Sequence, residues 1–207
     1  MSLDRPISPP STERDVSSDA DHAVSRRRGR SIFALNKNLN MSSAANVYTP
    51  PQVVSGIDVP AGVLNYLNGE DLLSKTQALR LSTVDPDGWP KAALLSAGDV
   101  LALSDRRLRL ALFANSGTAA NLERDGRLTL TMALNGGMCS LRLRARVCGQ
   151  GMPELSLAFF EAEIERVRMH VAAYADVTSG LTFTLHDPPA VLDRWQRQIA
   201  ALRAASS

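Results

Sequence analysis

The stretch "LRLALFANSGTAANLERDGRLTLTM", residues 108–132, joins two strand-like apolar runs through a loop of small residues. Ser116, Gly117 and Thr118 form that loop and lead into a short helix expected over 118–124. A helix N-terminus carries free backbone N–H groups, so a loop of small and hydroxyl residues there suits a phosphate. The same residues also suit an ordinary N-cap, in which Ser116 or Thr118 accepts a bond from the first turn. Both interpretations remain open from this stretch alone.

Short apolar runs on both sides of this stretch predict further strands. Apolar and β-branched residues alternate with polar ones in them, which is the period of a strand. Between them stand short turns rich in Asp, Asn, Ser and Gly, which favour tight hairpins. The paired runs are 77–84 with 90–96, 100–103 with 107–114, and 127–134 with 138–147. Successive antiparallel hairpins predict a closed or sandwich β architecture.

Helices are predicted beside these strands. "VPAGVLNYLNGED" (59–71) predicts a short helix closed by Asn68 and Gly69. Pro153 is expected to begin a longer helix, with Glu161, Glu165 and Arg168 on its solvated face. The apolar stripe of that helix would be Leu157, Phe160, Ile164, Val167 and Val171.

The C-terminal part of the chain predicts one more strand, over 179–186, and a final helix that opens at Asp187-Pro188-Pro189. Trp195 falls in the apolar stripe of that helix, which favours packing over ligand stacking. The other members of the stripe are Leu192, Ile199 and Leu202.

The first 45 residues differ in composition from the rest. They are rich in Ser, Pro, Asp and Arg and hold few large apolar residues, so we predict a disordered tail over 1–45. The arginines between 26 and 30 could contact nucleic acid or an acidic partner, but a solvated tail is favoured. The globular domain is expected over 50–207.

Composition excludes several classes of function. The formal net charge is +2, which makes no electrostatic case for nucleic acid. Cys139 and Cys148 do not make a disulfide framework, and no apolar run reaches the length of a membrane span. The N-terminus lacks the apolar core of a secretion signal. We therefore expect a soluble cytoplasmic protein with no membrane or nucleic-acid partner.

Catalytic and metal motifs are absent from the sequence. It has no Walker loop, no GxGxxG, no CxxC pair and no HExxH, and His22, His170 and His186 are scattered. No catalytic residue and no metal site is therefore assigned. Any redox reaction would need a cofactor to supply the chemistry.

Three segments together carry a resemblance to a known family. They are "STVDPDGWPKAALLS" (82–96), "AANLERDGRLTL" (119–130) and "LRLRARV" (141–147). In this order and spacing, over roughly residues 63–150, the chain resembles the pyridoxamine 5'-phosphate oxidase-like family of FMN-binding split β-barrels. The fold class implied is mainly β with flanking helices: an antiparallel split β-barrel with C-terminal helices.

The resemblance implies a homodimer with FMN at the subunit interface. Lys91 matches a basic phosphate ligand, and the backbone at Ala93 and Leu94 would lie near the flavin ring. Ser96 stands where the oxidase pattern has a lysine. Ser116 keeps the phosphate-binding hydroxyl of the loop, whereas Gly117 and Thr118 replace its usual arginine and lysine. The complete set of candidate cofactor-binding residues is Lys91, Ala93, Leu94, Ser96, Asn115, Ser116, Gly117, Thr118 and Asn121.

The missing basic pair removes two charge-assisted hydrogen bonds, each worth about 1.5–3 kcal/mol. Backbone N–H groups and hydroxyls of the loop could compensate. Arg142, Arg144 and Arg146 share one strand face, and one of them could reach the phosphate, although a solvated face is the favoured interpretation.

Three functions follow from the resemblance. The first is an FMN-binding flavoprotein, a flavin-dependent oxidoreductase acting on a small-molecule substrate. The second is a split-barrel ligand-binding protein without flavin redox activity, holding haem or another ligand, and the missing basic pair favours it. The third is a deazaflavin-dependent reductase.

Overall fold

Strands make up most of the computed structural model, which describes residues 52–53 and 57–206. These residues belong to one unit, Met41–Ser207. The predicted tail over 1–45 lies outside the described residues, and so does the predicted domain boundary at 50. The strands are β1 (Gln52–Val53), β2 (Leu79–Val84), β3 (Pro90–Leu95), β4 (Val100–Ala102), β5 (Arg107–Phe113), β6 (Arg127–Leu134), β7 (Gly137–Val147) and β8 (Leu157–His170). The helices are α1 (Ala61–Tyr66), α2 (Gly117–Asp125) and α3 (Pro188–Ala204), with short 3-10 turns η2 (Leu72–Ser74) and η3 (Pro153–Leu155).

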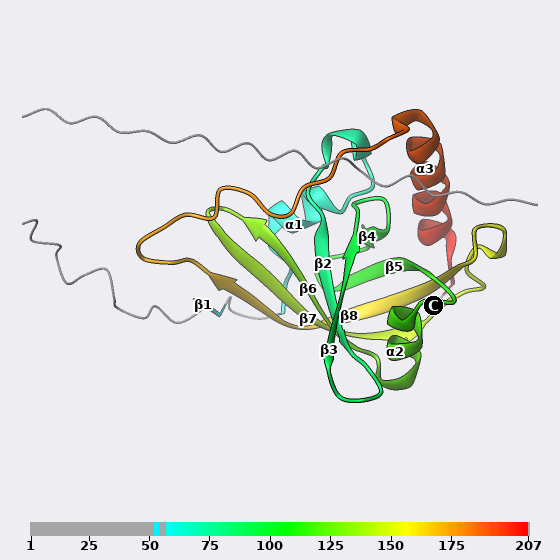
Figure 1. The fold of residues 1–207 in the computed structure, drawn as a ribbon, viewed down its shortest axis with the longest axis horizontal. Helices are drawn as coiled ribbons and strands as arrows, with labels where there is room; N and C mark the ends of the chain where they lie inside the picture. Colours follow the sequence, from blue (N-terminus) through cyan, green and yellow to red (C-terminus); the bar gives the residue numbers. More distant parts are fainter. Residues whose placement is uncertain (1–51, 54–56, 207) are drawn as a thin grey trace, which may run out of the picture. The chain divides into compact units, whose positions relative to one another are not determined.

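The strands form one antiparallel sheet in the order β3-β2-β6-β7-β8-β5-β4, and β1 pairs with β8 (Figure 1). The three predicted hairpins are present as β2–β3, β4–β5 and β6–β7. The sheet curls into a half-barrel, with helix α3 packed beside β4 and β5. This is the predicted mainly β split-barrel fold.

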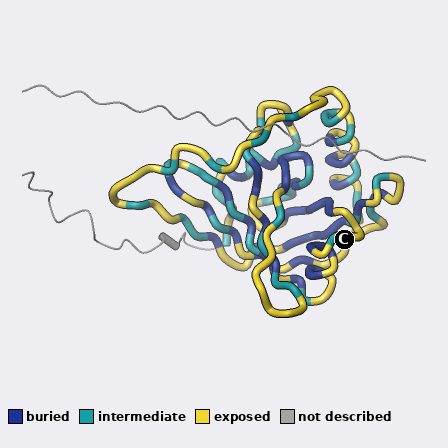
Figure 2. The backbone as a smooth tube through the Cα atoms, in the orientation of Figure 1, coloured by how far each residue is buried: buried dark blue, intermediate teal, exposed yellow. Residues whose placement is uncertain are grey.

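The buried residues form two clusters, one on each side of the curled sheet. Figure 2 shows buried positions along the strands and in α3. The first cluster fills the inside of the curl, and the second lies between the sheet and α3. Trp195 belongs to the second cluster at 2% exposure, which confirms that it packs. Asp187 caps α3 by accepting the N–H of Ala190 at 3.1 Å, with Pro188 in the first turn, so the predicted start of this helix is confirmed.

The predicted helix from Pro153 is wrong, because residues Leu157–His170 form strand β8. A β-bulge explains the error. Arg142 of β7 pairs with Arg166 and Leu143 pairs with Ile164, so Glu165 is an extra residue. The bulge puts Ile164 and Val167 into the same core cluster although they are three residues apart. A spacing of three residues between buried positions is also typical of a helix, so the sequence pattern favoured a helix here.

Burial of both faces also hides the strand character of β8. Phe160 and Ala162 enter the cluster inside the curl, whereas Leu157 and Phe159 face the cluster under α3. A strand covered on both sides is apolar without alternation. Four consecutive residues, 159–162, are therefore buried.

The predicted strand over 179–186 is also wrong. Its only pairing among the described residues is the isolated bridge between Thr182 and Gln77. Strand β2 follows Gln77, and β3 and β6 occupy its two edges. This segment can therefore pair only with the residues just before β2. Leu181 and Phe183 form backbone hydrogen bonds there.

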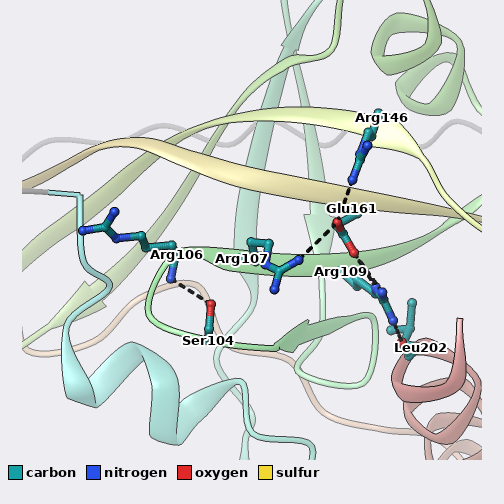
Figure 3. A network of polar contacts seen from close by, with 7 residues as sticks. All are labelled: Ser104, Arg106, Arg107, Arg109, Arg146, Glu161 and Leu202. Atoms are coloured by element: carbon teal, nitrogen blue, oxygen red, sulfur yellow. Dashed lines mark hydrogen bonds and ion pairs between the residues drawn. The ribbon is translucent and has the colours of Figure 1, made fainter. Parts of the chain in front are cut away.

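A buried ion network ties α3 to the sheet (Figure 3). The Arg109 guanidinium donates from Nε and Nη2 to Glu161 Oε2, at 3.0 and 2.8 Å, and from Nη1 to the Leu202 carbonyl at 2.7 Å. Arg146 reaches Glu161 Oε1 at 3.1 Å, and Arg107 lies 3.8 Å from it. Glu161, expected on a solvated helix face, is instead 1% exposed. Arginines from β5 and β7 thus meet at this one carboxylate of β8, and Arg109 links it to α3.

Candidate functional site

A pocket of about 290 Å³ opens between β3, β5, the start of α2 and α3. Four of the predicted cofactor-binding residues line it: Ala93, Leu94, Ser116 and Thr118. Its other walls are mainly apolar, from Leu95, Ala111, Leu112, Phe113, Leu155 and Leu157, with polar groups from Asp99, Arg194 and Gln198. An apolar pocket with a few convergent polar groups is the usual form of a small-molecule site.

Lys91 and Gly117 lie in direct contact next to Ser116 and Thr118 of the loop, although neither of them lines the pocket. A Cβ on Gly117 would meet the Nζ and Cε atoms of Lys91 and no other neighbour within 4 Å. The ammonium group therefore lies against the first residue of α2, where the positive end of the helix dipole is. Two positive features at one point, together with residues too small to cover them, make this a candidate site for an anion.

Ser116 is the N-cap of α2. Its Oγ accepts the N–H of Ala119 at 3.1 Å, so the capping interpretation is confirmed for this residue. The cap satisfies only one donor of the first turn. Helix geometry leaves the N–H groups of Gly117 and Thr118 without intrahelical acceptors. Capping and anion binding are therefore compatible at this helix.

Three other candidate residues do not line the pocket, and two of them have structural partners instead. The Ser96 N–H and Oγ donate to Asp99 Oδ2 at 2.8 and 2.6 Å, which fixes the turn between β3 and β4. Asn121, 2% exposed, donates to Thr83 Oγ1 at 2.9 Å and ties α2 to β2. Asn115 is exposed in the turn before α2 and does not line the pocket.

The strand arginines are not at the pocket either. Arg144 donates to Glu165 at 2.7 Å and Arg146 to Glu161 at 3.1 Å, both on β8. Arg142 is exposed on the same strand. The glutamates of β8 were expected on a helix, so these cross-strand pairs could not be anticipated.

Arg194 and Gln198 of α3 reach the pocket, and sequence reasoning missed them. Gln198 is 1% exposed and donates from Nε2 to Asp99 Oδ1 at 3.1 Å. Arg194 lies one turn earlier, and its Nε is buried without a hydrogen-bond partner among the described residues. One feature of the sequence pointed to this role: the polar Gln198 stands beside the apolar stripe predicted for the final helix.

The cysteines do not form a reactive or metal-binding site in the described part of the chain. Cys139 and Cys148 are buried and free. Burial raises the pKa of the Cys139 thiol to about 11, so it stays protonated and unreactive at neutral pH. No cluster of three or more possible metal ligands occurs among the described residues. Within the same residues, no helix is long and apolar enough to cross a membrane.

Comparison with known proteins gives one relative of high coverage. No protein-family model matches the chain. The uncharacterized protein YclD of Bacillus subtilis (strain 168) is 38% identical over 143 residues, which are 66% of this chain and 90% of YclD.

Solved structures with a similar arrangement of strands share little sequence with the chain. A protein assigned as a pyridoxamine 5'-phosphate oxidase, from Lactobacillus delbrueckii, is 16% identical at a TM-score of 0.45, over 56% of this chain and 98% of that one. HupZ of group A Streptococcus is 14% identical at a TM-score of 0.43, over 57% and 98%. An FMN-binding protein from Syntrophomonas wolfei is 16% identical at a TM-score of 0.38, over 51% and 86%.

Proposed function

The chain belongs to the same family as YclD, and from this premise we propose that it is a flavoprotein that binds FMN in the pocket between β3, β5, α2 and α3. The observation that carries the proposal is the contact between the Lys91 ammonium and Gly117 at the start of α2. A phosphate placed there would meet a lysine, free helix N–H groups and the Thr118 hydroxyl. The apolar pocket lies next to this point, where Ser116 and Thr118 of the loop and Ala93 and Leu94 of β3 line it.

The residues present fit FMN. Lys91, the N–H groups of Gly117 and Thr118, and the Thr118 side chain would hold the phosphate. Ala93 and Leu94 would contact the ring from β3, and Leu112 and Leu157 line the same pocket. The loop itself contributes no cation. The phosphate site therefore depends on Lys91 more than it would if the loop had its own arginine and lysine.

FMN, when bound, supplies hydride transfer to or from a second, small-molecule substrate, and the protein is then an oxidoreductase. The contribution of the chain is binding and positioning. Leu112, Leu155 and Leu157 exclude water from one side of the pocket. The network around Glu161 holds the C-terminal end of α3, the helix that brings Arg194 and Gln198 to the pocket.

Lys91→Gln is expected to raise the Kd for FMN about tenfold or more, because it removes a charge-assisted hydrogen bond to the phosphate. Titration with FMN, followed by quenching of flavin fluorescence, measures this. Lys75→Gln is the matched control, since Lys75 bonds Asn68 and lies over Tyr66, away from the pocket. If the wild-type protein is isolated colourless and binds no added FMN, a flavin-free ligand-binding role replaces the proposal.

A homodimer is proposed as the functional form. Leu94 and Phe113 line the pocket and are nevertheless 60% and 57% exposed. Leu94 lies on β3, the last strand at one end of the sheet. Exposed apolar side chains on a sheet edge are covered by a partner in many assemblies. A second copy of the chain at this edge would close the pocket.

Sedimentation velocity at micromolar concentration is expected to give a dimer for the wild type. Leu94→Asp is expected to shift the protein towards monomer and weaken FMN binding together, because the charge is buried in the interface. Thr129→Asp, a change at a half-buried site on β6 that does not line the pocket, controls for the added charge. A wild-type monomer that binds FMN tightly would contradict this proposal.

A further inference from the structure

Arg194 is the only arginine that lines the pocket within the described part of the chain. Its Nε is buried and has no hydrogen-bond partner there, and it takes part in no ion pair with the described residues. A buried donor of this kind is costly to leave unsatisfied. A ligand acceptor in the pocket would satisfy it.

The packing of α3 fixes which end of the pocket Arg194 occupies. Gln198, one turn later, donates to Asp99 Oδ1 at 3.1 Å and to the Gly98 carbonyl at 3.4 Å. Trp195 lies so close to Gly98 that a Cβ there would overlap its ring. Residues 194–198 therefore pack on the turn that follows β3. Arg194 belongs to the Leu95–Asp99 end of the pocket.

Lys91 stands at the opposite end of the same strand. A strand rises about 3.3 Å per residue, so the four steps from Lys91 to Leu95 cover about 13 Å. Arg194 is thus the cation of the pocket at its α3 end, and Lys91 lies beyond the other end, next to Ser116 and Thr118 of the lining. Such an arrangement suits an elongated ligand with one negative group at its end and further acceptor atoms in an apolar body.

Among the described residues, Asp99 is the one carboxylate that lines the pocket beside Arg194. Its oxygens accept from the Ser96 N–H and Oγ and from Gln198 Nε2. These bonds hold the carboxylate in the turn. The Nε of Arg194, which has no hydrogen-bond partner among the described residues, therefore remains available to a ligand.

We propose that Arg194 binds the ring end of the flavin, where it pairs with the oxygen and nitrogen acceptors of the ring and favours the reduced, negatively charged form. This inference rests on the proposed FMN binding, with the phosphate at Lys91. Positive charge next to a flavin ring tunes its electronics. Arg194 would thus set both ring affinity and reduction potential, whereas Lys91 would act on the phosphate alone.

The test compares FMN with riboflavin, which has the same ring and no phosphate. Binding is measured by fluorescence quenching for the wild type, Arg194→Gln, Arg194→Lys and Lys91→Gln. The midpoint potential of bound FMN is measured by reduction against a reference dye. Arg197→Gln is the matched control, because Arg197 lies on the same helix, pairs with Asp193 on the surface and does not line the pocket.

Arg194→Gln is expected to weaken FMN and riboflavin equally, by about tenfold. It is also expected to lower the midpoint potential, by about 30 mV for each tenfold loss of preference for the reduced form. Arg194→Lys should restore part of the potential, and Arg197→Gln should change nothing. Lys91→Gln should weaken FMN and leave riboflavin unchanged.

Two results would overturn the inference while leaving FMN binding intact. One is an Arg194→Gln protein with wild-type affinities and potential. The other is a loss confined to FMN, which would place Arg194 at the phosphate. A wild type that binds neither flavin would instead remove the proposed function, and the inference with it.

Discussion

Ser116→Asp is expected to lower the affinity for FMN by about a hundredfold or more and to leave the thermal stability of the protein unchanged. The new carboxylate would lie at the start of α2, where the Lys91 ammonium contacts Gly117, and would take the place of the phosphate. Like charges a few ångströms apart in a partly dry site repel by several kcal/mol. The fold should survive because Asp caps helices as well as Ser does.

Ser116→Asn is the matched control for this change. Asn has nearly the size of Asp and is an equally good N-cap, but it has no charge. It should therefore bind FMN close to the wild-type level in a fluorescence titration. Equal FMN binding by the Asp variant and the wild type would show that the loop serves only as a cap.

Glu161→Ala is expected to reduce the free energy of unfolding by about 3–5 kcal/mol, the usual cost of removing one partner from a buried ion pair. Arg109 is buried with 7% side-chain exposure, and the substitution would remove the carboxylate that its Nε and Nη2 groups contact. Arg146 and Arg107 are much more exposed, so water would take over their part of the network. Urea denaturation measures the change.

Glu165→Ala is the control, because Glu165 also pairs with an arginine on β7 but lies on the surface. Its loss should be below about 1 kcal/mol, as for most exposed ion pairs. The double variant Arg109→Met, Glu161→Leu should recover much of the stability lost in Glu161→Ala, since apolar side chains replace both charges. A loss below about 1 kcal/mol in Glu161→Ala would mean that Arg109 finds another partner.

The hairpins could be predicted from sequence because their signals are local. The turns at 85–88, 104–106 and 135–137 stand between alternating runs, and β2–β3, β4–β5 and β6–β7 follow from them. Helix α2 and its cap at Ser116 could also be predicted from local signals. The proximity of Lys91 to the loop could be predicted through the resemblance to split barrels.

Strand β8 and the α3 end of the pocket could not be predicted in this way. The bulge at Glu165 and the burial of residues 159–162 on both faces removed the alternation that marks a strand. Arg194 joins Leu95 in the pocket only through the docking of α3, about a hundred residues further along the chain. No local pattern reports a contact between segments so distant in sequence.

Because β8 lies between β7 and β5, the sheet cannot be completed until a late segment of the chain has emerged from the ribosome. Until then β5 and β7 each present an unpaired edge to solvent. Unpaired edges of this kind invite pairing with other nascent chains. The early hairpins can form locally, whereas the β5–β8 pairing must close a long loop first. The middle of the sheet is thus the last part of it to form.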